Sequence, residues 1–157
     1  MIELPDDEYF MREALRQALK AYDADEVPVG AVVVREDKII ARAYNQVELL
    51  KDATAHAEML ALTQAEAAVG DWRLTDCDLY VTKEPCAMCA GALVNARVAR
   101  LVYGCDDPKA GAIRTLYQLA DDARLNHRLL VTGGVLAAEC ADRLRQFFAK
   151  LRQPPLE

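Results

Sequence analysis

The stretch "CDLYVTKEPCAMCAGALVNARVARLVYGC" (residues 77–105) decides the fold class of this chain. Residues 77–83 are typical of a short strand. Pro85 then opens a helix over residues 86–96, as a proline just inside a helix start does. Residues 97–105 are typical of a second strand. Because strands that alternate with helices favour layered packing, the stretch predicts an α/β protein, a three-layer α/β/α sandwich.

The segments on either side continue this alternation. Apolar residues at helical spacing predict a helix near the N-terminus, and a β-branched run ending in a charged turn predicts a hairpin. We expect the hairpin to make the sheet mixed, and residues 1–157 to form a single domain. The remaining expected elements are a helix over 6–22, strands over 27–37 and 38–45, a helix over 54–70, a loop with a short helix over about 106–123, a strand over 127–134 and a helix over 136–151.

The composition is that of an ordinary soluble globular protein. Hydrophobic residues make up 53% of the 157 residues and charged residues 28%. No apolar stretch approaches the ~18 residues that a membrane span needs. The acidic start "MIELPDDEYF" lacks the basic and apolar regions of a signal peptide. We therefore expect a cytoplasmic protein with no membrane partner.

The cysteine content favours metal, redox or core roles over disulfides. The five cysteines are an odd number, and two of them stand as C-x-x-C. The other three lack the spacing of metal ligands and are expected in the core: Cys77, Cys105 and Cys140.

The charge is unevenly distributed. The net charge of −6 argues against non-specific binding to nucleic acid. Residues 1–78 hold 8 Lys and Arg against 17 Asp and Glu, whereas residues 79–157 hold 11 against 8. The second half could present a basic surface to a phosphate backbone. A solvated surface with uneven patterning is the simpler interpretation of charge alone.

Three side chains have the character of a metal site. Cys86 and Cys89 are spaced i, i+3, which puts both sulfurs on one helix face, in a first turn that favours thiolate. Two thiolates can chelate Zn²⁺, and His56 could add a nitrogen. Such a site has three protein ligands and leaves one position for water, whereas a structural zinc site uses four ligands.

Glu58, two residues after His56, has the character of a proton shuttle. It could take a proton from water at the metal and pass it to a leaving group. Positions i and i+2 of a regular helix do not face each other, so His56 and Glu58 must flank the metal from different sides or lie in an irregular first turn. C-x-x-C alone also fits a redox pair or core cysteines. H-A-E followed by P-C-A-M-C matches the H-x-E…P-C-x-x-C signature of zinc deaminases and predicts a catalytic metal site.

Four stretches resemble the bacterial tRNA-specific adenosine deaminases of the zinc-dependent cytidine deaminase-like superfamily. They are "TAHAEML", "LYVTKEPCAMCAGALVNARVARLVYG", "NHR" and "GGVLAAECADRLRQFF", and the similarity runs from about residue 5 to 150. The resemblance implies a mixed five-stranded sheet, usually in a homodimer, and one zinc ion per subunit.

The resemblance also implies the reaction. His56, Cys86 and Cys89 would bind zinc and Glu58 would shuttle the proton, while activated water attacks C6 of adenine. Ammonia leaves, and inosine remains at the wobble position of a tRNA anticodon stem-loop.

Asn45, Ala57 and Asp107 are the substrate-binding residues that the resemblance implies within the pocket. The amide of Asn45 could hydrogen-bond the base edge or the ribose. Without the family, a strand-end or turn residue is the favoured interpretation of Asn45. For Asp107, a turn residue before Pro108 is equally plausible on sequence alone.

Lys109 and Phe148 are the implied contacts to RNA outside the base. Lys109 could meet a phosphate or remain a solvated surface lysine. Phe147 and Phe148 fall where the family uses aromatic residues on its last helix, where one could stack on an unstacked anticodon base. Because aromatic residues at helical spacing are more often core, we expect one of the two to be buried and the other available.

Three places depart from the family pattern. Lys83 replaces an apolar residue and would add a cation near the metal if it points inward. Residues 111–116 are bulkier than usual, so they could reshape the nucleic-acid groove, and Arg114 could add a phosphate contact. Residues 119–127 bring Asp121 and Asp122 near the expected RNA path, where carboxylates would repel phosphate.

Two alternative functions remain open. The same chemistry could act on a free nucleobase or nucleoside of guanine, cytosine or adenosine type; the tRNA-type sequence after Cys89 argues against this. The chain could also be a non-catalytic, zinc-stabilised RNA-binding module. Glu58 argues against this second alternative, because a structural zinc site has no use for a glutamate beside it.

Overall fold

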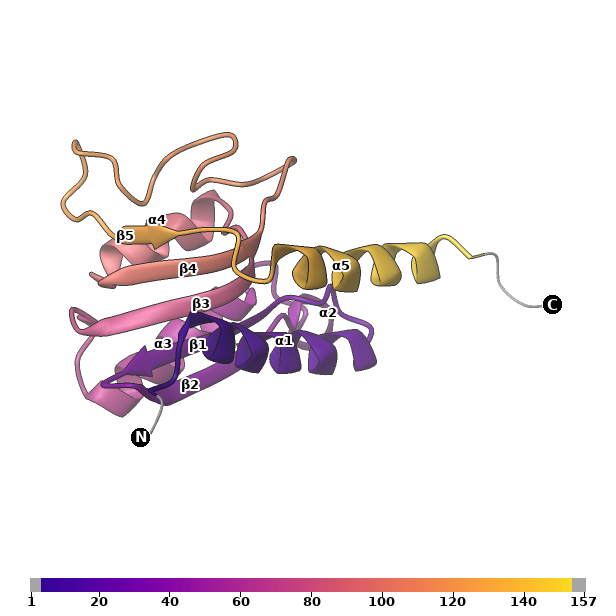
Figure 1. Cartoon of the computed structure of the whole chain (residues 1–157), viewed down its shortest axis with the longest axis horizontal. Coiled ribbons are helices and arrows are strands. Elements are labelled where there is room, and N and C mark those ends of the chain that lie inside the picture. Colours follow the sequence, from indigo (N-terminus) through magenta and orange to yellow (C-terminus); the bar gives the residue numbers. More distant parts are fainter. Residues whose placement is uncertain (1–3, 154–157) are drawn as a thin grey trace.

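The structure is a computed structural model that describes residues 4–153 (Figure 1). Five strands form one sheet in the order β2-β1-β3-β4-β5. β1 pairs antiparallel with β2 and β3, whereas β4 pairs parallel with β3 and β5, so the predicted mixed five-stranded sheet is confirmed. The elements are α1 (Asp7–Asp23), β1 (Gly30–Arg35), β2 (Lys38–Tyr44), α2 (Val47–Leu50), α3 (Ala57–Val69), β3 (Cys77–Lys83), α4 (Ala87–Asn95), β4 (Arg100–Cys105), β5 (Leu130–Thr132) and α5 (Ala137–Leu151).

Helices cover both faces of the sheet and complete the predicted three-layer α/β/α sandwich. α3 and α4 pack on one face, where their buried residues join alternate residues of the strands, such as Val33 and Leu79. α1 and α5 pack on the other face over Val32 and Tyr80. Alternation along each strand sends successive side chains to opposite faces, so the middle of each central strand is apolar on both faces, whereas polar residues such as Asp78 and Arg100 lie near the strand ends.

The packing of α1 on the sheet depends on a glycine. A Cβ at Gly30, the first residue of β1, would overlap the carbonyl oxygen of Ala14 in α1. Glycine therefore lets helix and strand approach closely at the end of the sheet where β1 begins.

One end of the sheet gathers the segments that carry the candidate residues. β3 and β4 end there at Lys83 and Cys105, while the antiparallel β1 begins there at Gly30 and β2 ends at Tyr44. Loops outside the carboxyl ends of parallel strands are the usual place for a ligand site in α/β proteins.

The structure corrects several predicted boundaries. The short helix expected within 106–123 is wrong, because that segment forms a succession of turns. The strand expected over 127–134 is limited to β5, and α2 follows β2 where no helix was expected. All three errors concern short elements whose shape depends on contacts with distant segments. Among residues 4–153, no helix combines the length and the apolar character needed to cross a membrane.

Candidate active site

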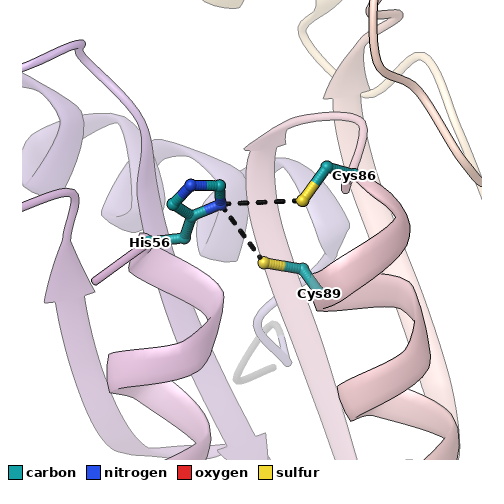
Figure 2. Close-up of side chains that lie close together, drawn as sticks. All are labelled: His56, Cys86 and Cys89. Atoms are coloured by element: carbon teal, nitrogen blue, oxygen red, sulfur yellow. Dashed lines mark hydrogen bonds between the residues drawn. The ribbon is translucent and has the colours of Figure 1, made fainter. Parts of the chain in front are cut away.

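Three metal-ligating side chains point toward one another where the N-termini of α3 and α4 meet (Figure 2). His56 is the N-cap residue of α3, Cys86 is the N-cap residue of α4, and Cys89 lies in the first turn of α4. Nδ1 of His56 lies 3.7 Å from Sγ of Cys86 and 3.5 Å from Sγ of Cys89. Tetrahedral zinc, with bonds of about 2.3 Å to sulfur and about 2.0 Å to nitrogen, would separate such atoms by about 3.6 Å. The donor types and spacings are therefore consistent with zinc.

The two cysteines of this cluster have opposite acidities. Hydrogen bonds with Cys89 and His56 lower the pKa of Cys86 to about 3, so this residue is a thiolate at neutral pH. The hydrogen bond with Cys86, together with burial, raises the pKa of Cys89. The hydrogen bond with Cys86 also raises the pKa of His56, against the effect of burial. Because metal-bound thiols are deprotonated, a metal ion that bound all three side chains would displace the proton of Cys89.

His56 and Glu58 avoid the difficulty of their i, i+2 spacing because only Glu58 belongs to the regular helix. His56 has extended backbone angles, φ −72° and ψ 151°. The direction of its side chain is therefore not set by the helical geometry that positions Glu58. Glu58 is only 4% exposed. Burial raises its pKa, while its backbone N–H and the nearby imidazole of His56 act in the opposite direction. A carboxyl group with a raised pKa beside the cluster can both take and return a proton near neutral pH.

An open pocket of about 520 Å³ adjoins the cluster. His56, Glu58 and Cys86 form what we call the metal wall of this pocket. Three other walls come from Val47 and Glu48 (the α2 wall), from Asp107 and Ala110 (the loop wall), and from Phe147, Phe148 and Leu151 (the α5 wall). The volume is in the usual range for a small-molecule site, roughly 300–1,000 Å³.

The structure brings Asn45, Ala57, Asp107 and Phe148 to this pocket, as the sequence predicted for substrate-binding residues. Their contacts with a substrate stay predictions. Lys109 does not line the pocket; it is exposed on the segment that follows Asp107.

Asn45 has an unused hydrogen-bond acceptor in the pocket. Its Nδ2 donates to the backbone oxygen of Val27 over 3.2 Å, and its side chain is held at 8% exposure. Its Oδ1 is buried with no hydrogen-bond partner within residues 4–153. Since a buried acceptor without a partner costs free energy, Oδ1 is suited to accept a hydrogen bond from a ligand.

Asp107 and Lys83 form an ion pair in the pocket lining. Nζ of Lys83 lies 3.3 Å from Oδ2 of Asp107, so the unusual lysine points inward. Oδ1 of Asp107 accepts hydrogen bonds from the backbone N–H groups of Lys109 and Ala110. Asp107 therefore combines the two interpretations from sequence, because it shapes its own turn and also faces the pocket.

The two phenylalanines of α5 divide as predicted. Phe147 is buried and makes an edge contact with Tyr22, whereas Phe148 is 41% exposed and lines the pocket. The exposed ring of Phe148 is available for stacking on a ligand.

The unusual segments 111–116 and 119–127 were expected to face the RNA, but several of their side chains are buried in the core or form ion pairs with one another. Ile113 is fully buried in the core, so its bulk does not project into a groove. Arg114 pairs with Asp121, and Asp122 pairs with Arg124. Ion pairs engage much of the positive charge of residues 79–157, namely Lys83, Arg100, Arg114, Arg124, Arg145 and Lys150.

Two buried glutamates beside the pocket were missed. Glu26 is 1% exposed and Glu84 is 0% exposed, and both line the pocket. Glu84 is adjacent to the Pro-Cys pair, and Glu26 precedes β1 in an acidic stretch; neither has a spacing that signals chemistry. Burial is the property that singles them out, and burial is visible only in the folded chain.

Comparison with known proteins defines the class of this fold and site. The sequence model of the MafB19-like deaminase family matches residues 5–152. A solved structure from work on A-to-I editing by tRNA:A34 deaminases at the wobble position of transfer RNA superposes with a TM-score of 0.84. The sequence of that solved chain is 43% identical to this one. The match covers 87% of this chain and 99% of the solved chain.

Relatives found by sequence show which group of deaminases this chain is most similar to among those compared. The tRNA-specific adenosine deaminase of Bacillus subtilis strain 168 is 49% identical over 147 residues, which cover 94% of this chain and 91% of the relative. A guanine deaminase from Nitrosomonas europaea shares the fold at a TM-score of 0.81 with 26% identity, over 94% of this chain and 87% of its own. The chain belongs to the tRNA-specific adenosine deaminases within the MafB19-like deaminase family.

Proposed function

We propose that this protein, as a single domain, converts adenosine to inosine at the wobble position of a tRNA anticodon by hydrolytic deamination. The observation that carries the proposal is the His56, Cys86 and Cys89 cluster beside buried Glu58, in a pocket open to solvent. Family membership supplies the reaction, and the B. subtilis relative and the tRNA:A34 deaminase structure support the substrate.

In the proposed mechanism, His56, Cys86 and Cys89 hold zinc. Zinc bound by these residues would lower the pKa of a water molecule and so supply a nucleophile at neutral pH. Glu58 accepts a proton from the attacking water and donates one to the departing amino group, so the bond between C6 and nitrogen breaks and ammonia leaves. The raised pKa of Glu58 suits this exchange, because burial disfavours the charged form of its carboxyl group and so makes the group a better proton acceptor.

We assign the seating of the nucleotide to four pocket residues. Oδ1 of Asn45 accepts a hydrogen bond from the base edge or the ribose, since it is a buried acceptor that has no partner among residues 4–153. Ala57, whose side chain is buried at the N-terminus of α3, leaves room for the base. Asp107 faces the ribose and backbone, and Phe148 stacks on a neighbouring anticodon base. Lys109, exposed beyond the rim, is placed to meet a phosphate.

The proposed assembly is a homodimer with one zinc ion per subunit. The family resemblance implies the dimer, and a surface of mixed apolar and polar residues around exposed Trp72 is available for it. A shallow hollow between α3 and α4 is lined by Met59, Leu62, Trp72 and Ala92, and Trp72 is 50% exposed. Light scattering should give twice the monomer mass for the protein and a lower mass for Trp72→Glu. A monomeric wild-type protein would contradict the assembly.

Deamination of a free base is the second candidate, because a guanine deaminase shares the fold. Its lower identity, 26% against 49% for the tRNA-specific relative, favours tRNA. A non-catalytic RNA-binding module is disfavoured by buried Glu58, because burial raises the pKa of its carboxyl group and a structural zinc site has no use for a glutamate beside it.

The test is inosine formation in an anticodon stem-loop that carries a wobble adenosine. The comparison substrates are the same loop with cytidine, free adenosine, adenine, guanine and cytosine, and Glu58→Ala serves as the blank. We expect inosine in the adenosine stem-loop alone. Turnover of a free base with an inert stem-loop would replace the proposal by the free-base alternative, and no turnover at all would favour the binding module.

A further inference from the structure

We propose that Glu26 and Glu84 are positioning residues that hold the α2 wall and the loop wall of the pocket in place for the tRNA substrate. This inference rests on the proposed function for its effect on catalysis. The contacts of each glutamate, however, are independent of any substrate.

Glu84 is the centre around which residues 107–115 are folded. Its Oε1 accepts hydrogen bonds from the N–H of Asp107 over 3.0 Å and from Oγ1 of Thr115 over 2.5 Å. Its Oε2 accepts from the N–H groups of Ile113, Arg114 and Thr115 over 2.8–3.0 Å. These donors come from a segment with no helix or strand of its own. A single buried carboxylate thus accepts hydrogen bonds from four backbone N–H groups that no helix or strand pairs.

The fit of the segment around Glu84 is close. A Cβ at Gly111 would overlap the carboxylate of Glu84, so the chain passes directly over it. The N–H of Ala112 donates to the backbone oxygen of Pro85, which ties the segment to the residue before Cys86. Asp107 and Ala110 of the loop wall are therefore fixed relative to the metal wall through Glu84 and Pro85.

Glu26 makes the corresponding contact on the α2 wall. Its Oε1 accepts from the N–H of Glu48 over 2.9 Å, and its Oε2 from the N–H of Leu49 over 2.7 Å. The four-residue α2 buries none of its side chains, and its N-cap residue Gln46 makes no side-chain capping bond. Glu26, from the segment before β1, thus takes the place of the missing cap.

A carboxylate is needed at both positions because every donor is an N–H or O–H group and each oxygen must accept. Hydrogen bonds to a charged acceptor are about twice as strong as neutral ones. A Glu→Gln change keeps the size but turns one acceptor into an NH₂ group that faces other donors. The bonded segment should then open locally while the sheet and the metal cluster stay intact.

The first experiment measures amide hydrogen exchange on the zinc-loaded full chain without RNA. In Glu84→Gln we expect the amides of Ile113, Arg114 and Thr115 to exchange roughly tenfold faster or more, with the α2 amides unchanged. Glu26→Gln should accelerate Glu48 and Leu49 and leave the loop wall unchanged. Each variant therefore controls for the other.

Two further variants complete the design. Thr115→Val, which removes one of the five hydrogen bonds to Glu84, should accelerate the same loop amides by a smaller factor, and it replaces Glu84→Gln if that variant does not fold. Glu139→Gln changes an exposed glutamate that pairs with Arg12 and should alter neither wall. Uniform acceleration across β1 and β4, or no acceleration at the bonded amides, overturns the proposal.

The second experiment measures kcat and KM for the stem-loop together with zinc content. Both Glu→Gln variants should keep one zinc ion per chain and raise KM roughly tenfold with kcat within about threefold, since the walls seat the substrate and the metal wall performs the chemistry. A fall in kcat at unchanged KM would overturn the positioning role. If the wild-type protein fails to deaminate the stem-loop, the proposed function fails, while the exchange experiment still tests the contacts.

Discussion

The metal wall and the loop wall of the pocket are built in different ways. The metal wall comes from two helix N-termini, with His56 and Cys86 as N-cap residues of α3 and α4. The loop wall comes from residues 107–115, which have no regular secondary structure and fold around the carboxylate of Glu84. The first wall is carried by regular helices, whereas the second is held by the hydrogen bonds to Glu84 and by the burial of Ala112 and Ile113.

The difference in construction suggests different tasks for the two walls: the metal wall for the reaction, and the loop wall for the choice of substrate. Side chains that must meet a metal ion within a few tenths of an ångström are carried by packed helices, which position side chains more accurately than loops do. Of the residues that depart from the family pattern, Lys83 lines the pocket, and residues 111–116 lie next to the loop wall and fold around Glu84. We infer that the reaction depends on the metal wall and substrate choice on the other walls.

Cys86→Ala removes one of the three proposed zinc ligands of the metal wall and should have the largest effect on activity. Removing one of three ligands should lower zinc below one ion per chain and reduce activity on the order of 10³-fold or more, since a metal site supplies several kcal/mol of barrier lowering. Zinc content by mass spectrometry and inosine formation are the readouts. Cys77→Ala, a buried cysteine outside the cluster, is the matched control. Full zinc content in Cys86→Ala would contradict the ligand assignment.

Glu58→Ala should separate proton transfer from metal binding. We expect unchanged zinc and an unchanged melting temperature within a few degrees, with kcat lowered by about 10²–10⁴, the usual contribution of a general acid–base group. Rates under single-turnover conditions check this, with Glu139→Gln as control. A variant that retains the wild-type rate would remove Glu58 from the mechanism.

Asn45→Ala tests the unpaired acceptor in the pocket. Because Oδ1 has no partner within the described chain, its removal should cost substrate binding more than folding. We expect kcat/KM for the stem-loop to fall about 10- to 100-fold, as for a buried hydrogen bond of about 1–3 kcal/mol. Loss of folding stability with unchanged kcat/KM would make Asn45 a structural residue only.

Phe148→Ala should change substrate binding, whereas Phe147→Ala should change the stability of the fold. Phe148→Ala should raise KM for the stem-loop by about tenfold, since stacking on a base contributes about 1–3 kcal/mol, and should leave stability unchanged. Phe147→Ala removes a buried ring and should destabilise the fold by about 3–5 kcal/mol. Thermal melts and Michaelis kinetics on both variants distinguish the two, and the reverse pattern would exchange their roles.

The smallest effect on activity is expected far from the pocket, at Asp7. Hydrogen bonds from Arg100 hold the pKa of Asp7 below its ordinary value of 3.8, against the effect of burial. Because the folded pKa is lowered, the ion pair stabilises the fold above about pH 4 and this contribution is lost as the pH falls below 3.8. Asp7→Asn should lower Tm by a few degrees at pH 7 and less at pH 3, with kcat unchanged. Equal losses at both pH values would show that the charge of Asp7 contributes nothing.

The fold and the metal wall could be predicted because their signals are local. Strand, helix and strand follow one another between residues 77 and 105, and C-x-x-C and H-A-E are short patterns whose spacing the metal dictates. The sequence left open how His56 and Glu58 share a site, because an N-cap residue with extended backbone angles is recognised only once the helix start is known.

The other walls could not be predicted because long-range contacts create them. Glu26 lies 22 residues from the amide of Glu48 that it binds, and Glu84 lies 31 residues from Thr115. Helix α2 is only four residues long and buries none of its side chains, so it is too short to show a helical period. Hydrogen bonds to Glu84 hold part of the turns that replace the expected helix within 106–123. Contacts of this kind leave no period or motif in the sequence.

The most direct measurement is a titration of metal-free protein with zinc that follows inosine formation in the wobble-adenosine stem-loop. We expect the rate to rise with zinc and to level off at one equivalent per chain, and no recovery for Cys86→Ala. Inosine formation at the full rate without metal, or stoichiometric zinc binding with no inosine formed, would contradict a catalytic zinc centre at His56, Cys86 and Cys89 that acts on tRNA.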